Sequence, residues 1–261
     1  MHLSFRREFA RASGFTLIEL MVGLAVSLIV VMAMVVVFRN TVTGSIQSVS
    51  SASTAGQTAF AELSALAELQ AAGYGIGIAS NADVANHLVV LSGASIDASS
   101  KKLTGATQKA LPSTPINIGA TASDKWNPAL CAAGGTQPAC GNTVLWTFND
   151  ITSATPTPIC RGLHVDGSSK QLILISSPSG VACSLSTPAN NWGNIVWTQQ
   201  TLATQLNLSS VAFMVAQPTS KCTLPGASTL PPKTPWVVSF WLDMGTTADR
   251  SMTACLGNMA T

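Results

Sequence analysis

FTLIELMVGLAVSLIVVMAMVVVF, residues 15–38, is the stretch that decides the organisation of this chain. Glu19 is its only charged residue, and Leu20 to Phe38 forms a run of 19 uncharged residues. A helix of that length rises about 28 Å, close to the roughly 30 Å hydrocarbon core of a bilayer. Residues 15–39 are therefore predicted to cross a membrane as a helix.

The charges on either side of this run predict its orientation. Arg6, Arg7 and Arg11 precede it, whereas Arg39 alone follows it directly. The excess of basic residues favours an N-terminus in the cytoplasm, with everything after Arg39 on the other side of the membrane. A cleaved secretory signal fits less well, because its apolar core has roughly 7 to 15 residues and a small-residue cleavage site follows it. A plain membrane anchor is the other alternative, but it gives no reason for an intramembrane Glu19.

Composition narrows the classes of protein further. Of the 261 residues, 47% are hydrophobic and 9% are charged, which excludes a solvated disordered chain. Three of the basic residues lie in the first fourteen positions, and the remainder of the chain has no net side-chain charge. A neutral body argues against a large electrostatic surface for nucleic acid.

The residues around the start of the apolar run form a recognisable signal sequence. Residues 14–20, GFTLIEL, follow a short basic leader and resemble the class III signal of type IV pilins and type II secretion pseudopilins. The resemblance implies that a prepilin peptidase removes residues 1–14 and that Phe15 becomes N-methylated. A glycine at position 14 suits a narrow peptidase cleft, because it has no side chain to block an extended conformation.

Cleavage after Gly14 would leave the α-amino group of Phe15 as the only cation near Glu19. An isolated carboxylate is penalised in hydrocarbon, so we expect Glu19 to pair with the N-terminal ammonium of a neighbouring subunit. Glu19 would then set the stagger between subunits. A snorkelling or protonated Glu19 near the membrane interface is the alternative.

Residues 40–72 are predicted to continue the helix as its amphipathic half. One stripe recurs in steps of three and four residues: Val42, Ile46, Val49, Ser53, Gly56, Phe60, Leu63 and Ala67. Many Ser, Thr and Gly residues make this segment a poor helix former, so packing must hold it. We expect one part to lie on the globular head and the other against neighbouring helices of a fibre.

Glycines 73, 75 and 77 are predicted to end the helix as a C-cap and exit turn. The segment before and through them, residues 68–75 (ELQAAGYG), resembles the helix end of PilW-type minor pilins. This second resemblance narrows the first from pilin-like proteins in general to one type of minor subunit.

Residues 73–261 are predicted to form a β-rich globular head with disulfide-bonded loops, which gives an α+β, pilin-like fold class. We find no internal repeat, and the tryptophans of the last third are expected to be buried. The candidate strands are His87 to Leu91, Thr143 to Phe148, Gln171 to Ser176, Asn194 to Thr198, Ser210 to Ala216 and Trp236 to Leu242.

Six cysteines lie beyond the span, in an oxidising compartment if the topology holds, and an even number favours three disulfides. Sequence alone allows fifteen pairings. The preferred pairing is sequential: Cys131 with Cys140, Cys160 with Cys183, and Cys222 with Cys255, the last resembling the C-terminal disulfide loop of many pilins. Zinc is the rival, but CxxC spacing is absent, so we expect no metal and no cofactor.

No catalytic constellation emerges from the sequence, and we expect no enzyme. His164 and Asp166 are two residues apart, but a solvated turn at residues 165–167 explains them without a catalytic role. Lys101 and Lys102 form the sole basic cluster, and a solvent-exposed loop accounts for them, which leaves nucleic acid out of the expected partners.

These observations together predict a minor pilin that primes or caps a type IV pilus used in adhesion and twitching motility. Its partners would be the prepilin peptidase, other minor pilins and pilus subunits through the N-terminal helix, and a tip adhesin. It would reside in the inner membrane and then in the fibre, at the tip. The alternatives are a type II secretion pseudopilin and, from other classes, a membrane-anchored periplasmic binding domain or an anchored hydrolase.

Overall fold

The computed structural model describes residues 16–116, 131, 137–150, 157–178, 183–185, 191–204, 206, 211–218, 236–241 and 251–259. The chain divides into two compact units, Met1–Ala52 and Ser53–Thr261, called here the N-terminal unit and the head unit. The helices are α1 (Leu17–Gln70), α2 (Asn81–His87), α3 (Asn191–Asn194) and the 3₁₀ helix η2 (Gly257–Met259). The strands are β1 (Leu88–Ser92), β2 (Ser95–Ile96), β3 (Leu103–Thr104), β4 (Thr107–Lys109), β5 (Ala139–Gly141), β6 (Thr143–Asp150), β7 (Thr157–Asp166), β8 (Gln171–Ser176), β9 (Thr198–Ala203), β10 (Phe213–Ala216), β11 (Trp236–Trp241) and β12 (Ser251–Leu256).

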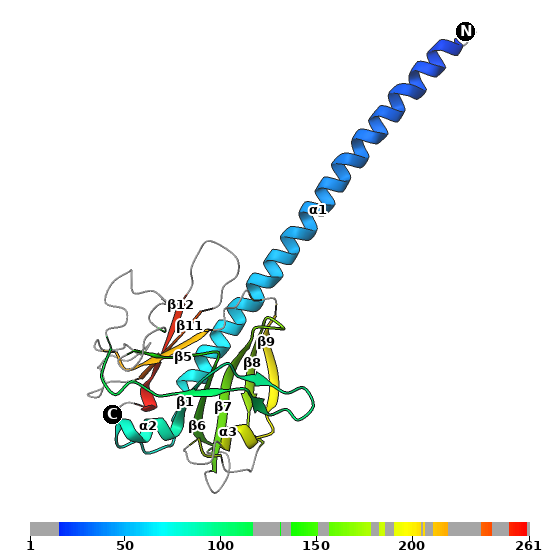
Figure 1. Cartoon of the computed structure of the whole chain (residues 1–261). Coiled ribbons are helices and arrows are strands. Elements are labelled where there is room, and N and C mark those ends of the chain that lie inside the picture. Colours follow the sequence, from blue (N-terminus) through cyan, green and yellow to red (C-terminus); the bar gives the residue numbers. More distant parts are fainter. Residues whose placement is uncertain are drawn as a thin grey trace, which may run out of the picture. The chain divides into compact units, whose positions relative to one another are not determined.

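The head unit contains two antiparallel sheets and a short hairpin. The larger sheet has six strands in the order β4-β1-β6-β7-β8-β9, and Figure 1 shows β6 to β9 side by side. The smaller sheet has four strands in the order β12-β11-β10-β5, and β2 pairs with β3. All neighbouring strands in these sheets, as far as the structure describes them, run antiparallel to one another.

The inner strands of the six-stranded sheet are buried on both faces, and their alternate residues enter two different cores. Val90, Val144 and Leu174 belong to a core that includes the end of α1 and the inner residues of the four-stranded sheet. Their chain neighbours Leu145 and Ile173 belong to a second core, which the tryptophans 192 and 197 help to form. Because successive side chains of a strand point to opposite faces, two-sided burial gives continuous apolar strands.

A tight corner joins the two sheets between β5 and β6. Gly141 ends β5, and a side chain there would collide with the carbonyl oxygen of Leu91. The next residue, Asn142, is buried, and its Nδ2 donates hydrogen bonds to the carbonyl oxygens of Ala94 (2.7 Å) and Val165 (3.2 Å). Its Oδ1 accepts one from the Ala94 N–H at 3.0 Å. One asparagine side chain thus satisfies three backbone groups, on two other segments, where the chain changes sheet.

The predicted α+β, pilin-like fold class is confirmed: a long apolar N-terminal helix precedes a β-rich head with disulfides. The candidate strand Gln171 to Ser176 coincides with β8, and those at residues 87–91, 143–148, 210–216 and 236–242 overlap β1, β6, β10 and β11. Three of the tryptophans expected to be buried, Trp192, Trp197 and Trp236, are at most 6% exposed.

The candidate strand Asn194 to Thr198 is wrong. Residues 191–194 form the single turn α3, and β9 begins only at Thr198. The Trp197 side chain holds this connection, because its indole N–H donates to the carbonyl oxygen of Trp192 at 3.1 Å. Strand β7 was missed because it contains Pro158 and Gly162. A side chain at Gly162 would collide with Leu145 of β6, so the glycine permits close packing rather than ending the strand.

Two hairpin turns of the head unit share a local sequence. Residues 96–103 read IDASSKKL and residues 165–172 read VDGSSKQL, and both form a hairpin turn. Asp97 Oδ1 accepts hydrogen bonds from the N–H and hydroxyl of Ser99, and Asp166 Oδ1 does the same with Ser168. The lysine that closes each turn, at positions 101 and 170, has a positive φ of 57° or 55°. The same local sequence therefore builds the same turn twice.

The disulfides of the described residues join Cys131 to Cys140 and Cys160 to Cys183. Both are pairs that the sequence analysis preferred, although Cys183 lies after β8 rather than on a strand. Cys255 of β12 is also disulfide-bonded. Cys222 lies outside the described residues, so its pairing with Cys255 stays a prediction.

Candidate assembly site

The first described residues form the N-terminal cap of α1. The Thr16 hydroxyl accepts a hydrogen bond from the Glu19 N–H at 3.3 Å, and the Thr16 carbonyl oxygen accepts one from the Leu20 N–H. Thr16 and Glu19 have the spacing of a capping box, which satisfies backbone donors that the first turn of a helix leaves free. Gly14 and Phe15 lie outside the described residues, so their predicted roles and the distance from Glu19 to the Phe15 amino group are untested.

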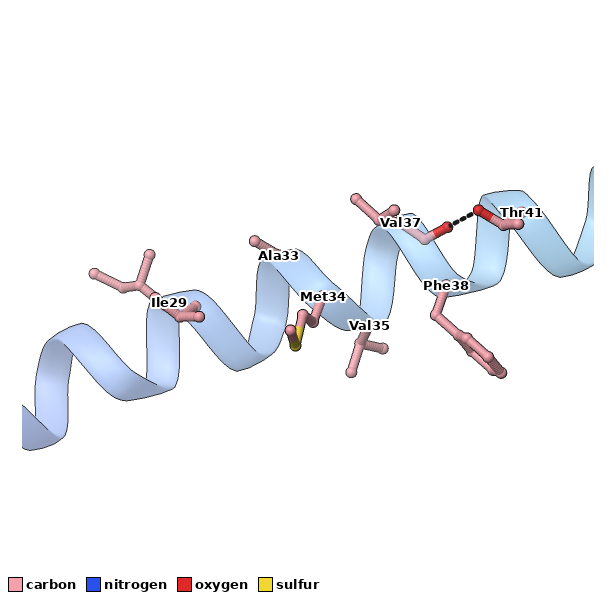
Figure 2. A pocket seen from close by; sticks show the side chains of 8 residues that line it. Ile29, Ala33, Met34, Val35, Val37, Phe38 and Thr41 are labelled. Carbon is pink, nitrogen blue, oxygen red and sulfur yellow. Dashed lines mark hydrogen bonds between the residues drawn. The ribbon is translucent and has the colours of Figure 1, made fainter.

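The apolar part of α1 presents its side chains outward. From Leu17 to Phe38 every large hydrophobic side chain is more than half exposed. Figure 2 shows Ile29, Met34, Val35 and Phe38 projecting from the helix, with the Thr41 hydroxyl bonded back to the Val37 carbonyl oxygen at 2.9 Å. Within the described residues, α1 is long and apolar enough to cross a membrane. Such a surface requires lipid or other helices around it.

The C-terminal part of α1, inside the head unit, buries one face. That face consists of Thr58, Ala61, Ala65 and Leu69, with Ala72 just beyond the helix, and their exposures are at most 1%. The predicted stripe is a different face: Phe60 and Leu63 are 63% and 66% exposed. The buried residues are mostly small, which lets the helix backbone approach the core closely, and so a search for large apolar residues missed them.

The glycines at the end of α1 form the expected exit turn, and the head unit fixes their position. Gly73 and Gly75 have φ of 75° and 71°. The Gly73 N–H donates to the Thr147 carbonyl oxygen at 2.9 Å, and a side chain at Gly73 would collide with Met259. The Asn149 side chain donates to the Gly75 carbonyl oxygen at 2.6 Å. Glycine is therefore required both for the left-handed conformation and for the approach of η2.

An ion pair joins α1 to the six-stranded sheet just before this turn. Arg161 Nη1 of β7 donates to Glu68 Oε2 at 2.6 Å, and the two side chains are 35% and 24% exposed. The Arg161 guanidinium also lies 4.8 Å from the centre of the Phe148 ring. Glu68 opens the segment that resembles the PilW-type helix end, and here it acts as an intramolecular contact. Sequence reasoning missed Arg161 because its partner is 93 residues away.

His164 and Asp166 lie in different surroundings. His164 is 1% exposed, its Nδ1 lies 2.7 Å from the Thr143 hydroxyl, and burial lowers its pKa to about 4. The expected solvated turn is therefore wrong for His164, which is part of strand β7. Asp166 does belong to the turn: burial raises its pKa, but hydrogen bonds from Ser168 and Ser169 outweigh this effect and lower the pKa to about 2.

No group of three or more His, Cys, Asp and Glu side chains in the described part of the chain is arranged to hold a metal ion. The turn of Lys101 and Lys102 is part of the β2–β3 hairpin, where Asp97 bonds to Ser99 and Ser100. The Lys101 carbonyl oxygen accepts a hydrogen bond from the Trp197 N–H at 2.9 Å, so the turn has a structural role in the head unit.

Residues 9–35 match a family model described as the prokaryotic N-terminal methylation motif. The N-terminus is pilin-like. The matched residues include Gly14, Phe15 and Glu19, and they support a type IV pilin or pseudopilin, a structural subunit anchored in a membrane. No curated protein and no solved structure shows significant similarity to the chain. The head unit is therefore characterised by its own geometry alone.

Proposed function

We propose that this protein is a minor pilin that primes or caps a type IV pilus. The proposal rests on one observation: the apolar part of α1, which overlaps the methylation motif at residues 9–35, exposes its large side chains. A helix of this kind is embedded in the inner membrane before assembly and exchanges lipid for neighbouring helices in the fibre. The partners are then other minor pilins and pilus subunits, which contact the chain through this helix.

Processing precedes assembly in this proposal. The prepilin peptidase removes residues 1–14, and methylation of the new N-terminus at Phe15 follows. The Glu19 carboxylate then pairs with the N-terminal ammonium of an adjacent subunit. The helix is otherwise apolar from Leu20 to Phe38, so this pair is the feature that distinguishes the correct stagger from a slipped one.

The PilW-type assignment rests on residues 68–75. In the head unit this segment contains Glu68, which pairs with Arg161, and two glycines in the left-handed conformation. The residues that resemble PilW-type proteins therefore have a structural role in this chain. The head then lies in the periplasm, and after assembly at the pilus tip, where it presents an adhesin. A type II secretion pseudopilin is the alternative, because it shares the N-terminal features.

A deletion strain separates these two functions. Loss of the gene should reduce the number of surface pili and twitching motility while leaving type II secretion intact, and the wild-type gene should restore both properties. Pili are counted by electron microscopy and secretion is followed by a secreted hydrolase. Normal piliation together with lost secretion would identify a pseudopilin instead.

A Gly14→Trp variant tests processing in the same strain. The bulky side chain should block cleavage, so that a full-length precursor stays in the membrane and piliation is not restored. The mass of the purified protein shows whether residues 1–14 have been removed. Loss of the leader mass from this variant would contradict the prepilin interpretation, whatever the phenotype of the deletion.

A further inference from the structure

The head unit contains a pocket at the edge of the six-stranded sheet, and none of the residues that line it belongs to α1. It has a volume of about 400 Å³ and is lined by α2, by the start of β1 and by the segment that begins in β4. Trp236 of the four-stranded sheet also lines it. Apolar walls come from Ala85, Leu88 and Leu111. A pocket of this size holds one or two side chains of a ligand.

One buried donor at this pocket has no partner. Trp236 is 1% exposed, and its indole N–H has no hydrogen bond to any described residue. Trp146 and Trp192 share this property, but neither lines the pocket. The Trp236 indole nitrogen is closed to solvent, so this side chain contributes an apolar wall to the pocket rather than a hydrogen bond to a ligand.

The charge of the lining favours an anion. Lys109 at the end of β4 is the one residue with an ionisable side chain among those that line the pocket, and it is exposed. Asp83 is the acid of α2, but its Oδ2 accepts hydrogen bonds from the Ser80 hydroxyl and the Ala79 N–H, at the outer end of that helix. The pocket therefore combines apolar walls with a single cation.

The neighbouring strand has a free edge. β4 is the last strand of its sheet, and among the described strands it pairs with β1 alone. An extended peptide can add to such an edge through backbone hydrogen bonds, and a pocket beside the edge then selects a side chain. A free fatty acid would use the cation and the apolar walls but leave this edge unused.

We propose that the pocket binds the carboxyl-terminal end of an apolar peptide. The peptide lies along the free edge of β4, its last side chain enters the space between Leu88, Leu111 and Trp236, and its terminal carboxylate meets Lys109. This site is independent of the proposed assembly through α1. It would give the head unit a way to hold the end of another protein chain.

The test uses the full chain in nanodiscs and fluorescence anisotropy of labelled peptides. The probe is the hexapeptide Ala-Thr-Ala-Val-Ala-Leu with fluorescein at its N-terminus and a free carboxylate, compared with the same peptide ending in an amide. The free acid should bind about two- to fivefold more tightly, because the interaction with Lys109 is charge-assisted but exposed to solvent. Equal affinities for acid and amide would overturn the proposal.

Three variants and one competitor sharpen the test. Lys109→Gln should abolish the preference for the acid, whereas Lys102→Gln, a lysine outside the pocket, should leave it unchanged. Ala85→Phe should fill the pocket and prevent binding of both peptides, with tryptophan fluorescence confirming a folded head. An unchanged preference in Lys109→Gln, or displacement of the peptide by an equal concentration of hexanoate, would overturn a site for peptide ends.

Discussion

The two parts of α1 belong to one helix, but they differ in which of their apolar side chains are buried within the chain. In the N-terminal unit the large side chains from Leu17 to Phe38 are exposed all round the helix. In the head unit the helix buries a narrow face of small residues against the core, while Phe60 and Leu63 stay exposed on the opposite side. The first part depends on a membrane or on other subunits, and the second is stabilised within its own chain.

This comparison shows that a regular stripe of residues along a helix does not by itself identify the face that packs against the core. The regular stripe from Val42 to Ala67 follows the large side chains, and those of Phe60 and Leu63 face away from the core. A helix held close to a sheet uses small residues, and these leave a weak apolar signal in the sequence. The exposed face is available to subunits of the proposed fibre.

The largest expected effect comes from the buried face. Leu69→Ala should lower the free energy of unfolding of the head by about 2 to 5 kcal/mol, because it removes a fully buried side chain and leaves a cavity. Leu63→Ala, in the same part of α1 but 66% exposed, should change it by less than about 0.5 kcal/mol. Chemical denaturation followed by tryptophan fluorescence measures the head alone, since all six tryptophans lie beyond residue 52. Equal losses in the two variants would contradict the assignment of the buried face.

Acid should act on the head unit through His164. Its pKa is lowered from 6.5 to about 4 by burial, so between these values the unfolded chain binds more protons than the folded one. The stability contributed by neutral His164 is complete above pH 6.5 and is lost as the pH falls towards 4, by an amount on the order of 3 kcal/mol. Asp166 has a pKa of about 2 in the folded head, so its contribution is lost below this window.

The readout for this prediction is the free energy of unfolding at pH 7, 5.5 and 4.5. His164→Gln, which removes the titrating group, should show a weaker pH dependence than the parent across this range. An identical slope in parent and variant would show that other groups carry the acid sensitivity of the head.

A smaller effect is expected where α1 meets the sheet. Glu68→Gln and Arg161→Met should each lower the free energy of unfolding by about 1 kcal/mol, because the ion pair is partly exposed and partly screened. Arg161→Met should cost slightly more, since it also removes the contact with the Phe148 ring. A double-mutant cycle isolates the pair. A coupling energy near zero would mean that the glycine turn alone positions the end of the helix.

The fold class and the N-terminal motif could be predicted from sequence because their signals are local. The apolar run, the heptapeptide at residues 14–20 and the glycines after residue 72 each act over a few positions. The duplicated turns at residues 96–103 and 165–172 were equally local, and comparing the two octapeptides would have found them. Their shared Asp, Ser, Ser and Lys residues are a signal of turn chemistry.

Other features depend on contacts between distant segments. Gly162 looks like a strand breaker until Leu145 of the adjacent strand is placed beside it. Asn142 satisfies three backbone groups on two distant segments, and its neighbours along the chain give no sign of this role. Local sequence patterns predict many of the helices and strands, whereas features such as Gly162 and Asn142 depend on contacts with distant segments.

In the proposed fibre the exposed N-terminal part of α1 is the assembly surface, and Glu19 determines the stagger between subunits. The most direct measurement is the incorporation of a Glu19→Val variant into sheared pili, detected by immunoblotting, with cleavage of the leader followed by mass. Glu19→Asp serves as the control that keeps a carboxylate. We predict that the Val variant is cleaved and inserted in the membrane but absent from the fibre, because the span loses its one charged group. Incorporation of the Val variant as efficient as that of the parent would contradict the claim.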